Sequence, residues 1–229
     1  MDSLIVDEFE RACLTGDIET VEKFFYEYKV ENVNMLKMRN LVVKEGHLNV
    51  LEYFYRYDVN LNEFYEYQSP LFIAIYKGWV DVTDFCIESG ADVNIKDNNG
   101  GSALFRAAGS GHLEILDKLI INGGDIYHCD KEGQNLLFFA AISGVPDVFM
   151  RVLSFGFEIN QQTDDGTTSL MIAVIYRNTE IVKILLEHGA DPMIKDDEGK
   201  IALDFAEDPE IKNFMKTYMS SYNDDIKNL

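Results

Sequence analysis

The stretch SALFRAAGSGHLEILDKLIINGGDIY, residues 102–127, decides the fold of this chain. Its first segment is short, apolar and rich in alanine, and Gly111 then permits a tight turn between two helices. Over residues 113–120, apolar side chains recur at spacings of three, four and seven, which indicates an amphipathic helix. Gly123 ends that helix, and the polar stretch up to Gln134 predicts an extended hairpin loop. The segment therefore predicts a helix, a turn, a second helix and a hairpin.

The same pattern recurs with a period of 33 residues. Gly78, Gly111 and Gly144 mark the turns of three successive copies, and Arg177 stands at the corresponding position of a fourth. The four copies in register cover residues 69–94, 102–127, 135–160 and 168–193. A fixed period of this length is the signature of stacked repeats. We therefore predict an all-α repeat solenoid with helix-turn-helix-hairpin repeats.

Weaker copies flank these four. Gly46 marks a turn within residues 41–62, and Gly16 marks another within residues 9–25. Residues 199–206 begin a seventh copy, which then departs into a polar, charged tail. Irregular ends around a regular middle are expected, because a terminal repeat must present a polar outer face. We therefore expect about seven repeats in all.

We assign the whole chain, 1–229, to one domain of stacked repeats. Its two weak N-terminal copies are expected to be ordered, because their aromatic side chains need a neighbouring repeat to bury them. Those side chains are Phe24, Phe25, Tyr53 and Phe54. The predicted subdivisions are an N-terminal capping repeat at 1–36, a divergent second repeat at 37–63, four regular repeats at 64–195, and a C-terminal capping repeat with its tail at 196–229.

Several features of the sequence are typical of a cytoplasmic protein. The N-terminus is acidic and lacks the basic start and long apolar stretch of a signal peptide. Apolar runs stay shorter than the roughly 18 residues that suggest a membrane span. Cys13, Cys86 and Cys129 are far apart and form no CxxC pair, as expected in a reducing compartment. We expect a location in the cytoplasm, or in the host cytosol if the chain is a secreted effector.

The charge of the chain is strongly negative. Forty acidic residues oppose 20 basic ones, for a formal net charge of −20. Such a field repels phosphate backbones and anionic membranes, so we exclude nucleic acid and membrane surfaces as partners. It favours encounter with a basic protein surface. The alternative is that the acidity only keeps a long scaffold soluble.

The repeat pattern resembles that of the ankyrin family, whose repeats contain a T-P-L-H-x-A-A helix start, a G-H turn and a G-A-D-x-N exit. The matching stretches are residues 69–72 (SPLF), 90–94 (GADVN), 111–112 (GH) and 189–192 (GADP). One departure is systematic, because the histidine of the helix start is replaced in all four regular copies. The replacements are Phe72, Phe105, Phe138 and Met171. We expect apolar packing there in place of a hydrogen bond.

Catalytic and metal-binding patterns are mostly explained by the repeat. His47 and His112 fall in the G-H turn, and His188 lies at a helix end, where the helix dipole favours a cation. His128 lies beside Cys129, a pair that could ligate a metal or act as base and nucleophile. Adjacent residues rarely point to one centre, and no further ligand cluster has usable spacing. We predict no metal, no cofactor and no enzyme activity; an enzyme using His128 and Cys129 remains an alternative to be tested.

The family resemblance implies that the hairpin tips and the exposed side of each first helix form a concave binding surface. The predicted tip residues are Tyr65, Glu66, Gln68, Asn98, Asn99, Lys131, Glu132, Gln134, Asp164 and Asp165. The predicted helix-end residues are Tyr76, Lys77, Ser110, Ile142, Ser143, Ile175 and Tyr176. These two sets together are called the predicted surface below.

Large side chains stand at some helix ends where polar residues would be expected. The candidates for interface hot spots, in which tyrosine is enriched, are Tyr76, Ile142, Ile175 and Tyr176. Gly109 and Ser110 between the first two predict a shallow recess with Tyr76 and Ile142 as its walls. The alternative is that these side chains fold back and belong to the core.

Two classes of function remain open besides the enzyme alternative. The first is a monomeric, non-enzymatic adaptor or scaffold that binds a folded protein or an extended basic peptide. The second is an inhibitor, an assembly chaperone or a pathogen effector that caps a partner's functional site. Trp79, the single tryptophan, occupies the register of the turn histidine, and we expect it to pack rather than to contact a partner.

Overall fold

The computed structural model describes residues 3–28, 33–57, 60–66 and 68–227 of the chain. The predicted domain limits at 1 and 229 lie outside these residues. The chain divides into two compact units, which are described separately. Unit 1 contains Met1–Ser110 and Glu114–Asp125, and unit 2 contains Gly111–Leu113 and Ile126–Leu229.

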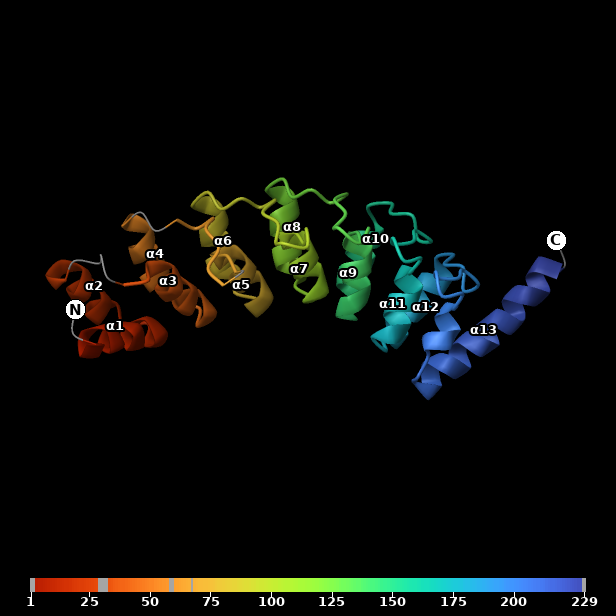
Figure 1. The fold of residues 1–229 in the computed structure, drawn as a ribbon. Helices are drawn as coiled ribbons and strands as arrows, with labels where there is room; N and C mark the ends of the chain where they lie inside the picture. Colours follow the sequence, from red (N-terminus) through yellow and green to blue (C-terminus); the bar gives the residue numbers. More distant parts are fainter. Residues whose placement is uncertain (1–2, 29–32, 58–59, 67, 228–229) are drawn as a thin grey trace. The chain divides into compact units, whose positions relative to one another are not determined.

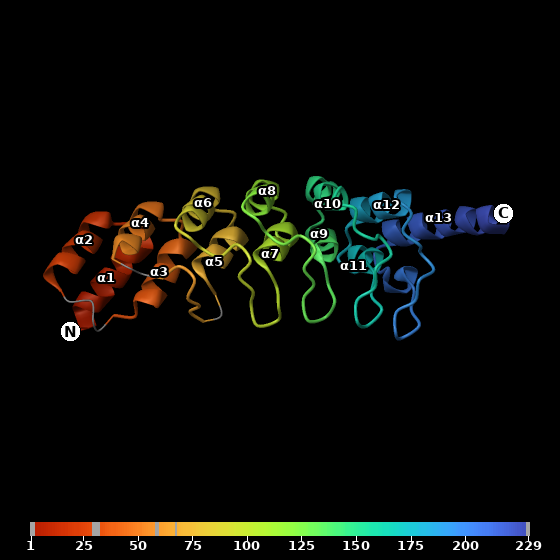
Figure 2. The same cartoon turned by 90° about the horizontal axis from the view of Figure 1, so that it is seen from above.

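The helices of unit 1 form consecutive pairs joined by short turns (Figure 1). Neighbouring first helices pack on one another from α1 through α3 and α5 to α7, and α2 packs on α4, which packs on α6. The hairpin loop before α7 projects beyond the first helices, on the side away from α6 and α8 (Figure 2). The helices are α1 (Ser3–Thr15), α2 (Ile18–Glu27), α3 (Met35–Lys44), α4 (Leu48–Arg56), α5 (Pro70–Lys77), α6 (Val80–Glu88), α7 (Ala103–Gly109) and α8 (Leu113–Ile121), whose first residue belongs to unit 2.

Unit 2 repeats this arrangement. Its α9 packs on α10 and α11, and α11 packs on α12 and on a short 3-10 helix, η2. The loops before α9 and α11 project beyond these first helices, away from α10 and α12 (Figure 2). The elements are α9 (Leu136–Ser143), α10 (Pro146–Leu153), α11 (Ser169–Ile175), α12 (Thr179–Glu187), η2 (Ala202–Phe205) and α13 (Pro209–Lys227).

Each regular repeat starts its first helix with the same cap. The hydroxyls of Ser69, Ser102 and Thr168 each accept a hydrogen bond from the backbone N–H three residues later, at 3.3 Å. Asn135 caps α9 through its side-chain oxygen, which accepts from the N–H of Leu137 at 2.9 Å. A capping side chain of this kind stabilises a helix by about 1 kcal/mol. The polar residue at the helix start therefore fixes where each first helix begins.

The residues that replace the family's histidine are core residues. Phe72, Phe105, Phe138 and Met171 are all buried, in agreement with the expected apolar packing. The loss of hydrogen bonding is incomplete at the last of them, because the Met171 sulfur accepts a weak hydrogen bond from the backbone N–H of Thr168 at 3.5 Å. The first helices can approach one another closely because alanines such as Ala107 and Ala140 are buried beside these large side chains.

An asparagine at the exit of several repeats joins it to the next repeat. The Asn94 amide donates to the carbonyl of Gly123 at 3.0 Å, and its oxygen accepts from the N–H of Asp125 at 2.8 Å. Asn62 makes the same pair of bonds in unit 1, and Asn160 does so in unit 2. Tyr127 occupies this register in the remaining repeat, where its hydroxyl donates to the carbonyl of Phe155 at 3.3 Å. We call the three asparagines the Asn clamps.

The end of the chain differs from the expected polar tail, because α13 forms there. Ile211 and Met215, four residues apart, are fully buried and give this helix an apolar stripe against the preceding elements. Asp208 caps it by accepting from the N–H of Glu210 at 2.8 Å, and the Tyr218 hydroxyl donates to the carbonyl of Leu186 at 3.0 Å. The many charged residues of this segment concealed the stripe in the sequence.

Arg177 adopts a strained backbone at the turn between α11 and α12, with φ of 60° where the other repeats have glycine. A left-handed conformation costs a residue with a Cβ about 1–2 kcal/mol. The ion pair between Arg177 and Glu207 offsets little of this cost, because both side chains are exposed. We expect Arg177→Gly to raise the free energy of unfolding by about 1 kcal/mol, measured by urea denaturation.

Arg177→Ala is the matched control for this prediction. It removes the ion pair but keeps the Cβ, so its stability should stay at or below that of the wild type. Equal stabilities of the glycine and alanine variants would show that the backbone of residue 177 stores no strain.

Candidate functional site

The first hairpin tip of the predicted surface is held in place by hydrogen bonds from a buried side-chain amide. Tyr65 and Gln68 exchange two backbone hydrogen bonds, at 3.0 and 3.1 Å. The side-chain amide of Asn40, buried in α3, donates to both of their carbonyls, at 3.3 and 3.1 Å. Glu66 between them has φ of 50° and is exposed. A hydrogen bond with Glu66 raises the pKa of the Tyr65 hydroxyl above its usual value.

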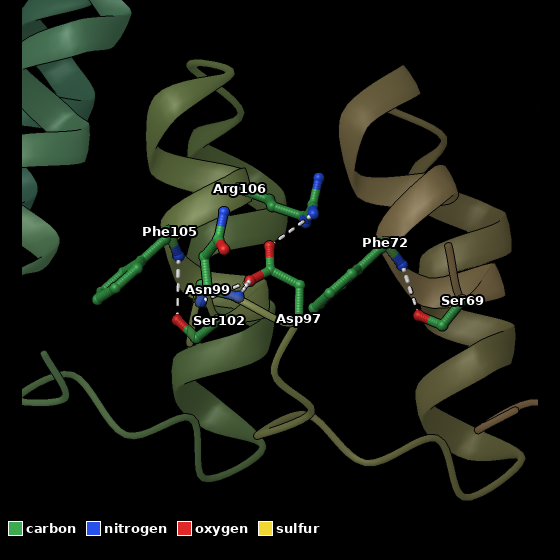
Figure 3. A network of polar contacts seen from close by, with 8 residues as sticks. Ser69, Phe72, Asp97, Asn99, Ser102, Phe105 and Arg106 are labelled. Carbon is green, nitrogen blue, oxygen red and sulfur yellow. Dashed lines mark hydrogen bonds and ion pairs between the residues drawn. The ribbon is translucent and has the colours of Figure 1, made fainter. Parts of the chain in front are cut away.

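The second tip is organised by Asp97 (Figure 3). One of its carboxylate oxygens accepts from the backbone N–H groups of Asn99 and Gly101, at 2.9 and 2.8 Å. The other forms an ion pair with Arg106 of α7 at 2.9 Å. The Arg106 guanidinium in turn lies 4.3 Å from the centre of the Phe72 ring. The Arg106 side chain therefore links this tip to the first helices.

Two hollows meet at Arg106, and both lie within unit 1. The first, with a volume of about 740 Å³, is lined by Phe64, Glu66, Lys96, Asp97, Asn98, Asn99 and Arg106. We call it the tip hollow. The second, with a volume of about 270 Å³, is lined by Lys44, Gln68, Phe72, Ile73, Tyr76, Lys77 and Arg106. We call it the lysine hollow.

The predicted residues of unit 1 therefore come together in two groups. Glu66, Asn98 and Asn99 line the tip hollow, and Gln68, Tyr76 and Lys77 line the lysine hollow. The Tyr76 side chain is 68% exposed, so it is not a core residue. Ser110 is half-buried at the end of α7 and Tyr65 at the first tip; neither lines either hollow.

In unit 2 the predicted tip residues form a row linked by backbone hydrogen bonds. The N–H of Asp164 donates to the carbonyl of Glu132 at 3.1 Å, and the N–H of Asp197 donates to that of Asp165 at 3.0 Å. Hydrogen bonds from Thr163 and Thr167 lower the pKa of the Asp165 carboxyl. The Asp165 carboxylate is consequently negatively charged at neutral pH. Lys131 is exposed beside it, and Gln134 is half-buried.

The helix ends of unit 2 are less uniform than the sequence suggested. Ile175 and Tyr176 are exposed, as expected of contact residues. Ile142 is half-buried, and Ser143 bonds within its own turn, donating to the carbonyl of Ala140 at 2.8 Å. Tyr76 and Ile142, the expected walls of the recess, belong to different units, so the recess remains a prediction.

The repeat pattern and this arrangement agree with a comparison against protein families. A family model described as ankyrin repeats (3 copies) matches residues 39–127 and again residues 104–196. The two matches together span 39–196, well over half of the chain.

The chain belongs to the ankyrin-repeat family.

The predicted fold class, an all-α repeat solenoid of ankyrin type, is thereby confirmed. Over the described residues, the ankyrin-repeat protein has 13 α-helices and one 3-10 helix, which is consistent with about seven repeats. A search of the curated proteins finds no match. None of the described helices combines the length and the apolar character needed to cross a membrane.

The sequence analysis missed Lys44 and Arg106. Arg106 occupies the register of Ile73, Phe139 and Ile172, so a charged residue at an otherwise apolar position was a visible signal. Lys44 stands two residues before Gly46, as Tyr76 does before Gly78. Extending the helix-end register into the weak second copy would have found it.

The three cysteines of this ankyrin-repeat protein differ in burial. Burial raises the pKa of the Cys13 and Cys86 thiols to about 12, so both are unreactive at neutral pH. Cys129 is exposed, next to His128 in the loop before α9. Among the residues that the structure describes, no group of three or more His, Cys, Asp and Glu side chains is placed to hold a metal ion.

Proposed function

We propose that this protein is a non-enzymatic adaptor or scaffold that binds a partner protein through the predicted surface. Ankyrin repeats are generally protein–protein interaction modules. The observation that carries the proposal is Tyr76, a largely exposed aromatic side chain at the rim of the lysine hollow. Aromatic side chains at the edge of a pocket are typical interface anchors, and a few of them supply most of the binding energy.

The charge of the chain supports a partner with a basic surface. Glu66, Glu132, Asp164 and Asp165 place carboxylates on the tips, and the net charge of −20 extends the negative field over the molecule. Such a field accelerates encounter with a positively charged protein. We propose that the protein acts in the cytoplasm as a monomer. An inhibitor or chaperone would use the same surface, and the identity of the captured partner separates these roles.

Affinity capture from the native host's lysate tests the predicted surface. The triple variant Tyr76→Ala, Ile142→Ser, Tyr176→Ala is expected to lose the partner that the wild-type chain retains. Truncating an interface anchor typically costs about 2 kcal/mol or more, which for one such residue is already more than tenfold in affinity. Quantitative mass spectrometry of the retained proteins gives the readout.

The matched control is Tyr26→Ala, Ile121→Ser, Met150→Ala, which removes three exposed apolar side chains outside the predicted surface. It should retain the partner at the wild-type level. Circular dichroism must first show that both variants are folded. Retention of the same protein by the triple variant and the wild type would place the binding site elsewhere.

A further inference from the structure

The lysine hollow has a local charge opposite to that of the chain. Three of its seven lining residues are basic, and none of the described residues that line it carries a carboxylate. Acidic residues outnumber basic ones two to one over the whole sequence, so this cluster does not reflect the composition. The three cations come from three neighbouring repeats: Lys44 ends α3, Lys77 ends α5, and Arg106 lies in α7. The stacking of first helices is what brings them together.

The two lysines of this hollow have their charges available. Among the described residues, Lys44 and Lys77 form no ion pair, whereas Lys37 pairs with Glu10 at 2.9 Å and Lys118 with Asp84 at 2.7 Å. Arg106 is different, because it is bound to Asp97 and stacked on Phe72. Arg106 is therefore a fixed part of the wall, and the two ammonium groups are the donors that a ligand would meet.

The floor of the hollow is apolar. Phe72 and Ile73 are buried in α5 and face it, and Tyr76 stands exposed at its rim. An ion pair formed over an apolar floor is stronger than one in open water, because the local dielectric constant is lower. A volume of 270 Å³ equals roughly nine waters of the bulk liquid, which is enough for one acidic side chain and part of an apolar neighbour.

A carboxylate suits this hollow better than a phosphate does. Among the described residues that line the hollow, Arg106 has the one guanidinium, and its Nη2 atom already donates to Asp97, which weakens its grip on a phosphate by two hydrogen bonds. A phosphate group with its nearly double charge would also be repelled more strongly by Glu66 and by the net charge of the chain. The two hollows share Arg106 and so adjoin each other, and the tip hollow is lined by Asn98 and Asn99.

We infer that the lysine hollow binds an aspartate or glutamate side chain, next to an apolar residue, from an extended segment of the partner protein. This inference rests on the proposed function and names the chemistry recognised at one place on the same surface. The negative field of the chain and the positive hollow have separate roles. The field acts on the partner's overall charge before contact, and the hollow fixes which residue of the partner lies at Lys44 and Lys77.

Selection of peptides from a random displayed library on the full chain tests the inference. The expected peptides share an acidic residue next to an aromatic or branched apolar one. A synthetic copy should bind Lys44→Gln/Lys77→Gln about tenfold or more weakly by fluorescence anisotropy. Replacing the acidic residue of the peptide by the corresponding amide should weaken its binding to the wild-type chain by a similar factor. The two changes together should cost little more than either alone, because they remove the same contact.

The control variant is Lys212→Gln/Lys216→Gln in α13, which changes the net charge equally at two exposed lysines. It should bind the peptide within about twofold of the wild type, and circular dichroism should match for all chains. An equal loss in this control would mean that only long-range charge matters and would overturn the inference. The inference would also be overturned if the selected peptides lacked an acidic residue or if no peptide were selected. It would be overturned as well if a peptide with phosphoserine in place of its acidic residue bound more than tenfold more tightly.

The two proposals can fail separately. If the acid dependence is absent while Tyr76→Ala, Ile142→Ser, Tyr176→Ala still loses the captured partner, the predicted surface stands and the lysine hollow has another role. If the peptide binds as expected while the triple variant keeps the partner, the hollow is a peptide site and the partner binds elsewhere.

Discussion

Replacing Phe9 by alanine is expected to lower the free energy of unfolding by about 3–5 kcal/mol. Phe9 is fully buried in α1, where its ring stacks on that of Phe24 with 3.9 Å between centroids. The rings of Phe25 and Phe54 lie at 6.0 and 6.2 Å, so one side chain joins α1, α2 and α4. The truncation would leave a cavity shared by three helices, and the aromatic pairing would be lost with it. Urea denaturation followed by circular dichroism measures the change.

Hydrogen exchange would localise this effect. Because repeats are stabilised by their neighbours, amides in α1 to α4 should lose protection before those of α5 to α7. Tyr26→Ala is the control, since Tyr26 lies in α2 beside the cluster but is 93% exposed and should change stability by less than about 0.5 kcal/mol. A loss below about 1 kcal/mol for Phe9→Ala would contradict the packing of this cluster.

Arg39→Met is expected to lower the free energy of unfolding by about 3 kcal/mol, although it removes a buried charge. The Arg39 side chain is fully buried and donates hydrogen bonds to the side-chain oxygen of Asn40 at 3.1 and 3.0 Å. It also donates to the backbone carbonyls of Asn60 and of Glu63, the latter at 2.8 Å. Burial lowers the pKa of its guanidinium to about 10, which still leaves it charged at neutral pH. Methionine would leave these acceptors without a donor at the base of the first hairpin tip.

Arg39→Lys distinguishes the charge from the geometry. Lysine keeps the charge but lacks the planar guanidinium that reaches the two carbonyls and Asn40 together. The free energy of unfolding of this variant should therefore fall by about 1–2 kcal/mol. The measurement is again urea denaturation. The affinity of the selected peptide for the lysine hollow, which Gln68 and Tyr76 line, is a second readout by fluorescence anisotropy. If Arg39→Met is as stable as the wild type, the desolvation cost of the buried charge equals the stabilisation by its hydrogen bonds, and the prediction is wrong.

The repeat made most of the fold predictable from the sequence. The glycines at 78, 111 and 144 predicted tight turns, and the structure has turns there with φ of 74°, 77° and 68°. Register alone placed a turn at Arg177, which no local preference of arginine would have indicated. The helix α13 was missed because few of its residues are apolar. The burial of those residues also depends on packing against the elements that precede the helix in the sequence.

The site was harder to predict because it depends on how side chains from different repeats meet. Arg39 lies 32 residues before Leu71, at a core position where no sequence rule anticipates a charge. Its function as a donor to loop carbonyls becomes visible only when the loop is in place. Tyr76 was found because a large side chain at an exposed register is itself a signal. Lys44 and Arg106 matter only in combination, and a single sequence shows them as isolated residues.

The Asn clamps have a consequence for synthesis on the ribosome. Every clamp joins residues 28–31 positions apart, so it closes as soon as the next repeat has left the exit tunnel. Contacts of such short sequence separation form quickly and need no distant segment. Nascent chains can therefore fold one repeat at a time, with only the newest repeat exposing its apolar face to chaperones or to other chains.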